Sequence, residues 1–222
     1  MSPLAFLLHG AAAGLMAYGW LSLQQLPISA LLASQKGGHF QFLTIQGLLV
    51  AWLTMVASLV SDIAPSVKIL RGIKRILLMA SLPLSVVIST IYWTLLLAMP
   101  HLILRPDSPV DSEPSASSEA PGFSRIPLST DLALHAVPGV ALLLDFLLFE
   151  KKYSKKQVRY GFVLMALVGT WYSVWVEHCA KYNGTFPYPF LTLSPFHIRV
   201  AIYAGASLFA YLSFIGLNSL GN

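Results

Sequence analysis

The chain has 222 residues, of which 56% are hydrophobic and only 10% are charged. A soluble domain carries about 25% charged residues, so this composition excludes an ordinary soluble protein and predicts one all-α transmembrane domain, 1–222. The net charge of +5 does not indicate a nucleic-acid partner, because the basic residues cluster in short stretches between apolar segments. The single cysteine, Cys179, excludes an intrachain disulfide and a cysteine-based zinc site.

Six apolar segments predict a polytopic bundle of about six transmembrane helices: Leu4–Leu26, Phe42–Val60, Ile76–Leu104, Leu132–Phe149, Gly161–Ala180 and Ile198–Leu217. At a rise of about 1.5 Å per residue, most of them match a hydrocarbon core about 30 Å thick. The third segment is longer and contains Pro83, so a kink or a tilt is expected there.

The basic residues predict the orientation of this bundle. Nine of the fourteen lie in two expected loops, after the second and the fourth segments: Lys68, Arg71, Lys74, Arg75, Lys151, Lys152, Lys155, Lys156 and Arg159. The positive-inside rule places these loops, and with them both termini, in the cytosol. The stretch 105–130 is rich in Ser, Pro and acidic residues, which predicts a disordered non-cytosolic linker between the third and fourth spans.

Four polar residues lie near the non-cytosolic ends of three predicted spans. Thr44 opens the second span, His135 opens the fourth, and Glu177 and His178 close the fifth. Ionisable groups at membrane depth are costly, so each is a functional candidate. This topology brings a hydroxyl, two imidazoles and a carboxylate to a similar shallow depth.

These side chains are sufficient for ester hydrolysis. His135 is the candidate base that activates the Thr44 hydroxyl as a nucleophile. Asp131 lies four residues before His135, on the same helix face, and is a candidate to orient its ring. Thr44 also lies in the first turn of its helix, where free N–H groups favour an oxyanion.

Structural roles remain open for each of them. Thr44 is also typical of a helix cap or an interhelical hydrogen bond, and Asp131 of the N-cap of the fourth span. Glu177 and His178 can simply reach the membrane interface. Asp145, deep in the fourth span, is expected to pair with a basic loop residue or with Gln46 or Ser58 of another helix. The remaining histidines default to structural or solvated roles and lack metal-ligand spacing: His9, His39, His101 and His197.

The chain carries an ordered set of polar and aromatic residues: Phe42-Leu-Thr-Ile, Val60-Ser-Asp62, Pro83, Tyr92-Trp93, His135, Pro138, Glu150, Trp175-Val-x-His178, Gly184 and Tyr188-Pro-Phe-Leu191. From about Phe40 to Leu217, this set resembles the androgen-induced-gene family of membrane threonine hydrolases, which cleave fatty acid esters of hydroxy fatty acids. The family's essential threonine and histidine match Thr44 and His135. The chain departs from the family in its long linker and in Glu177, which stands where the family has a second histidine.

The resemblance implies an intramembrane lipid esterase that takes its substrate from the bilayer. No cofactor is expected, and the spacing of the histidines predicts no metal site. Aromatic and polar residues at the same end are the candidates for substrate binding: Phe42, Gln46, Trp93, Trp175 and Tyr188. The endoplasmic reticulum is the expected location, with the plasma membrane as the alternative. A non-catalytic carrier, a lipid-binding protein or a regulatory scaffold is the competing class, and the oligomeric state stays open.

Overall fold

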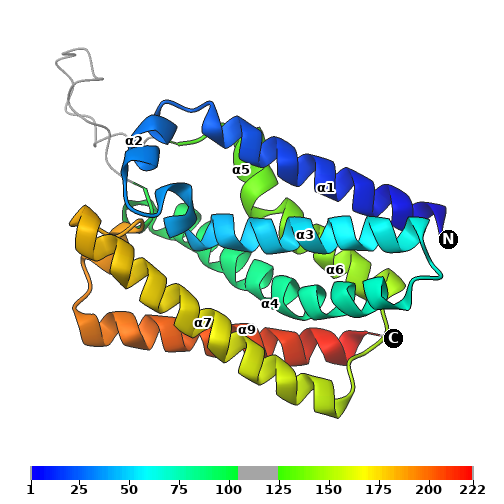
Figure 1. Cartoon of the computed structure of the whole chain (residues 1–222). Coiled ribbons are helices and arrows are strands. Elements are labelled where there is room, and N and C mark those ends of the chain that lie inside the picture. Colours follow the sequence, from blue (N-terminus) through cyan, green and yellow to red (C-terminus); the bar gives the residue numbers. More distant parts are fainter. Residues whose placement is uncertain (1, 105–124, 222) are drawn as a thin grey trace.

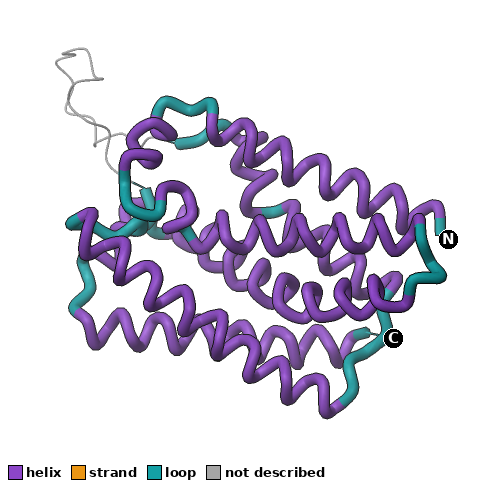
Figure 2. Tube along the Cα trace, in the orientation of Figure 1, coloured by secondary structure: helices purple, strands orange, loops and turns teal. Residues whose placement is uncertain are grey.

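The computed structural model describes residues 2–104 and 125–221, and within these ranges every regular element is a helix (Figures 1 and 2). The long helices are α1 (Pro3–Gln24), α3 (Leu43–Ile63), α4 (Lys68–Ala98), α7 (Lys155–Asn183) and α9 (Phe196–Leu220). Two shorter helices, α5 (Leu128–His135) and α6 (Val137–Phe149), follow each other with a bend of 40°. The short elements are α2 (Ile28–Ser34), η1 (Gly38–Gln41), η2 (Pro100–Leu102) and α8 (Pro189–Thr192).

The expected six-span bundle is confirmed. Five of the described helices are long and apolar enough to cross a membrane, and the bent pair α5–α6 makes a sixth span. Helices α1, α3, α4 and α6 surround a core that includes Met16, Met55, Leu78, Leu142 and Phe146. Helices α7 and α9 pack on each other and against α4, and Figure 1 shows them as a flanking pair beside that core.

The two ends of the bundle carry different parts of the chain. The N- and C-termini lie at one end, with the α3–α4 and α6–α7 connections (Figure 1). The opposite end holds α2, η1 and the connection from α7 to α9, together with the starts of α3 and α5. This arrangement follows from consecutive spans that run antiparallel. We call the two ends the terminal end and the loop end.

Three predicted boundaries were wrong. The basic residues Lys68, Arg71, Lys74 and Arg75 lie in the first two turns of α4 and not in a loop. In the same way, Lys155, Lys156 and Arg159 lie in the first turns of α7. Long lysine and arginine stems let a helix begin beyond the hydrocarbon while the charged groups reach polar partners. The predicted linker 105–130 ends too late, since α5 begins at Leu128; its part 105–124 lies outside the described residues.

The break between α5 and α6 positions the end of α5. Pro138 occupies the first turn of α6, and a proline there has no N–H to donate to the carbonyl one turn back. The helix therefore restarts at Val137, and at this break the carbonyl of His135 accepts a hydrogen bond from Ser89 of α4. As a result, His135 is the last residue of α5 and faces the interior at the loop end.

Candidate active site

Thr44 is the second residue of α3, and its hydroxyl points into the bundle. The N-cap of α3 is Phe42, without a side-chain cap, so the capping interpretation of Thr44 was wrong. Thr44 Oγ1 instead lies 3.4 Å from Nε2 of His135, across the interface between α3 and α5. Thr44 is only 9% exposed and His135 only 7%, so the contact is shielded from bulk water.

Asp131 orients the imidazole of His135 from one turn earlier in α5. Its Oδ1 lies 2.7 Å from Nδ1 of His135. Because an ionised carboxylate only accepts hydrogen bonds, Nδ1 carries the proton and Nε2 presents its lone pair to Thr44. The N-cap interpretation of Asp131 was wrong, because α5 begins at Leu128.

Tyr92 of α4 fixes the plane of the histidine ring. The two rings stack with centroids 3.4 Å apart and an interplanar angle of 1°. Sequence reasoning had selected the neighbouring Trp93, which packs edge-on against Tyr92, 5.4 Å away. Ser89 and Tyr92 of α4 both contact His135. Residues three apart share one side of a helix, so the spacing of these two polar side chains was the sequence signal for the face of α4 that meets His135.

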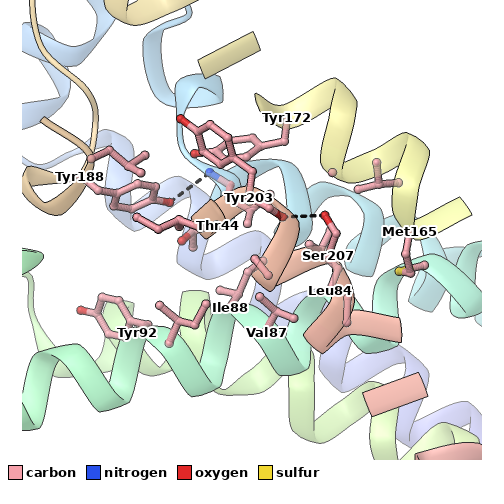
Figure 3. Close-up of a pocket in the computed structure, with 18 of the residues that line it drawn as sticks. Thr44, Leu84, Val87, Ile88, Tyr92, Met165, Tyr172, Tyr188, Tyr203 and Ser207 are labelled. Carbon is pink, nitrogen blue, oxygen red and sulfur yellow. Dashed lines mark hydrogen bonds between the residues drawn. The ribbon is translucent and has the colours of Figure 1, made fainter. Parts of the chain in front are cut away.

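Tyr188 occupies the N-terminus of α3, where the sequence predicted free donors for an oxyanion. Its hydroxyl accepts a hydrogen bond from the Leu43 N–H at 3.1 Å (Figure 3). Burial raises the pKa of this phenol, which therefore keeps its proton at neutral pH. The hydroxyl thus retains a proton to donate, held beside Thr44 by the backbone of α3.

Two pockets meet at Thr44. The inner pocket lies between α4, α7 and α9 and is lined by residues such as Leu84, Val87, Met165, Tyr203 and Ala210 (Figure 3). The loop pocket is lined by residues of the loop end, among them Leu32, His39, Phe42, Arg125, Asp131, His135 and Pro187. Both are lined by Thr44, Tyr92, Ile103 and Tyr188. These four residues form the junction of the two pockets.

Of the predicted substrate-binding residues, Phe42 and Tyr188 line these pockets and Gln46, Trp93 and Trp175 do not. Gln46 donates to the Phe40 carbonyl at 2.8 Å and accepts from the Trp171 indole at 3.2 Å. Trp175 donates to the same carbonyl at 2.9 Å. Gln46 and Trp175 therefore hold the loop before α3 against α7, and their polar atoms are engaged in hydrogen bonds within the protein.

The structure does not bring Glu177 and His178 to the Thr44–His135 pair. Glu177 binds the Arg199 guanidinium through both oxygens, at 2.7 and 2.9 Å, and also accepts from the Tyr203 hydroxyl. His178 is exposed, and its ring packs between Trp175 and Tyr182. Glu177 thus joins α7 to α9 and positions Tyr203, which lines the inner pocket.

A second set of buried polar residues, which sequence reasoning did not assemble, lies near the terminal end. His9 of α1 lies 2.7 Å from Asp62 of α3 and 2.9 Å from Asp145 of α6. Lys74 of α4 lies 2.8 Å from Asp145 and 2.9 Å from Glu150. Asp145 therefore pairs with one of the basic residues that had been expected in a loop. These five residues form the ion network, and they line neither the inner nor the loop pocket.

The described residues contain no group of three or more His, Cys, Asp or Glu side chains placed to hold a metal ion. Their arrangement defines a polytopic helical membrane protein with a buried hydroxyl, imidazole and carboxylate between two largely apolar pockets. A family model described as FAR-17a/AIG1-like protein matches residues 4–222. The chain belongs to the FAR-17a/AIG1-like family, which confirms the resemblance seen in the sequence.

The comparison with curated proteins points to the same family. Over 215 residues, the chain is 28% identical to a UPF0641 membrane protein of Schizosaccharomyces pombe, a match that covers 96% of this chain and 88% of that protein. No solved structure matches the chain.

Proposed function

We propose that this protein is an intramembrane lipid esterase in which Thr44 is the nucleophile and His135 the general base. The observation that carries the proposal is the continuous chain from Thr44 Oγ1 to His135 Nε2 at 3.4 Å and from His135 Nδ1 to Asp131 Oδ1 at 2.7 Å. A nucleophile, a base and a group that orients the base are the parts that acyl transfer requires. In the absence of substrate, the contact between nucleophile and base is commonly longer than in the reacting complex.

The reaction proceeds in two half-reactions. Thr44 Oγ1 attacks the ester carbonyl carbon while its proton passes to Nε2 of His135. The tetrahedral intermediate expels the alkoxide, which takes this proton and leaves as the alcohol, and the acyl group stays on Thr44. Water then gives a proton to His135 and attacks the acyl-threonine; the fatty acid leaves, and the proton returns to the Thr44 oxygen.

Two neighbouring groups support the charged states of this cycle. Asp131 stabilises the imidazolium that forms whenever His135 holds the extra proton. The Tyr188 hydroxyl, anchored by the Leu43 N–H, is placed beside Thr44 to donate to the oxyanion of the tetrahedral intermediate. Its buried position excludes competing water and strengthens that hydrogen bond.

The pockets and the family favour an ester with two aliphatic arms, such as a fatty acid ester of a hydroxy fatty acid. Both pockets are lined mainly by apolar side chains, which suits a substrate that partitions into lipid. Thr44 lies in the first turn of a membrane-spanning helix, close to the depth where water can supply the second half-reaction. We place this activity in the endoplasmic reticulum membrane, with both termini of the protein in the cytosol.

Labelling by a fluorophosphonate probe and hydrolysis of a long-chain ester test the proposal in full-length protein. We expect wild type to be labelled, and Thr44→Val and His135→Ala to lose labelling and at least about 100-fold of the turnover rate. Thr94→Val and His101→Ala, at exposed positions, are the matched controls and should behave as wild type. Unchanged hydrolysis in folded Thr44→Val would contradict the proposal, and folded wild type that neither labels nor hydrolyses any ester would favour a carrier or scaffold.

A further inference from the structure

We propose that the two arms of the substrate have fixed places: the acyl chain fills the inner pocket, and the alcohol arm lies in the loop pocket. This assignment rests on the proposed esterase function, because it needs a carbonyl carbon next to Thr44. The junction formed by Thr44, Tyr92, Ile103 and Tyr188 is shared by both pockets. An ester bond held there necessarily directs its two arms into different spaces.

The position of the base decides which arm goes where. His135 and Asp131 line the loop pocket and not the inner pocket. The leaving oxygen must receive its proton from Nε2 of His135 when the tetrahedral intermediate collapses. The alcohol arm, which carries that oxygen, therefore lies on the His135 side, and the acyl chain extends to the other side of Thr44.

The second half-reaction leads to the same orientation. The water that cleaves the acyl-threonine also has to reach Nε2 of His135, so it must arrive where the alcohol has just left. The loop pocket includes polar and charged residues of the loop end, His39 and Arg125 among them. An acyl chain that stayed in this pocket would block the water, whereas one in the inner pocket leaves the space open.

The polar atoms of the inner pocket are already bonded within the protein. Ser207 donates to the Tyr203 carbonyl at 2.8 Å, Tyr203 donates to Glu177 at 3.0 Å, and Tyr172 donates to the Gln41 carbonyl at 3.4 Å. A polar ligand group would have to compete with these bonds. The remaining surface is hydrocarbon, which favours a plain acyl chain over a chain that bears a carboxylate.

The inner pocket also has a limited depth. From Tyr92 to Leu84 on α4, and from Ile202 to Ala210 on α9, the lining runs about 12 Å away from the Thr44 level at the rise of a helix. Val87, Met165 and Ala210 pack together at the far end. Helices α7 and α9 are in direct contact along one wall of the pocket, since a Cβ on Gly169 would lie 2.0 Å from Ser207 Oγ. Acyl chains longer than this depth should therefore fit poorly.

Photocrosslinking tests the orientation without requiring turnover. Full-length Thr44→Val protein in lipid nanodiscs is irradiated with two esters that carry a diazirine at the end of the acyl chain or at the end of the alcohol arm. We expect the acyl label on α4 and α9, between Leu84 and Val87 or between Ala206 and Ala210, and the alcohol label on residues 28–39 or near Pro187. The reverse pattern, or the same pattern for both probes, would overturn the assignment even if the protein hydrolyses esters normally.

Ester series give an independent test in the active protein. Ala210→Phe should reduce the rate for long acyl chains at least about tenfold while sparing short ones, and chain length in the alcohol arm should have no such effect. Ala206→Leu, closer to Thr44, should shift the limit to still shorter chains. Ala204→Phe on the exposed face of α9 is the matched control. A shift that follows the alcohol arm, or no shift in folded variants, would refute the proposed depth limit.

Discussion

Buried polar groups at the two ends of the bundle are held in opposite ways. In the ion network, Asp145 is 0% exposed, and its Oδ1 binds both His9 and Lys74. Both ring nitrogens of His9 lie within hydrogen-bonding distance of carboxylate oxygens. Oδ2 of Asp145 is buried without a hydrogen-bond partner among the described residues, but it faces neither the inner nor the loop pocket. The network links α1, α3, α4 and α6 and lies away from the two pockets described above. Its hydrogen bonds and ion pairs hold these helices together.

At the loop end, the corresponding polar groups are left partly free. Nδ1 of His135 is bound by Asp131, but Nε2 faces Thr44 at 3.4 Å, next to two pockets. Tyr92 and Asp131 fix the ring without consuming its reactive nitrogen. The contrast indicates that burial by itself does not mark a functional site; a buried group with an unused bonding capacity next to open space does.

Asp131→Asn should have the largest effect on the turnover rate, and it directly tests the difference between the two ends of the bundle. The amide keeps the shape of the carboxylate but can offer a donor to Nδ1, which favours the wrong tautomer and leaves the imidazolium without its counter-charge. We expect the turnover rate to fall about 10³- to 10⁴-fold with little change in thermal stability. Kinetics and a melting curve on the same preparation measure both quantities.

The control for this variant lies at the other end of the bundle. Asp62→Asn makes the same chemical change next to His9, and it should lower stability while the activity per folded molecule stays within about twofold of wild type. If Asp131→Asn instead lowered only stability, or Asp62→Asn abolished turnover in folded protein, the proposed division between the two ends would be wrong.

Lys74→Met should give the largest loss of stability. It removes the ammonium group that Asp145 and Glu150 share, which leaves Asp145 with His9 alone and Glu150 with Arg75 alone. The removal of one partner of a buried pair costs about 3–5 kcal/mol. Combining it with Asp145→Leu removes the stranded charge and should recover part of that loss. Equilibrium unfolding of both variants measures this coupling. A Lys74→Met protein as stable as wild type would show that the ion network does not hold the helices together.

Tyr188→Phe should have an intermediate effect on catalysis. It removes the proposed oxyanion donor and should lower the turnover rate about 100-fold with a smaller change in KM. Since burial raises the phenol pKa above its ordinary value of 10.0, the donor is present at all lower pH values, and the ratio of the two rates should be constant from neutral to mildly alkaline pH. A ratio that falls steadily across this range would contradict a protonated donor.

The sequence predicted the spans and the Thr44–His135 pair because both follow from one-dimensional signals. Hydropathy gives each span, and the alternation of sides then gives the depth of a residue near its end. Hydropathy and the alternation of sides do not give the rotation of each helix about its axis, which decides which side chains face one another. Thus Trp93 was selected where Tyr92 faces His135, and the ion network was missed because His9, Lys74 and Asp145 lie on three helices far apart in the chain.

The direction of the Gln46 side chain also could not be predicted from the sequence. Its substitution should have the smallest effect. Its amide joins the Phe40 carbonyl to the Trp171 indole, so Gln46→Leu removes two partly exposed hydrogen bonds at the start of α3. We expect a loss of about 1–2 kcal/mol in stability and less than about a threefold change in turnover, because the Thr44 backbone is held separately by Tyr188 through Leu43. A loss of turnover as large as that of Tyr188→Phe would mean that Gln46 contacts the substrate, the role predicted from the sequence.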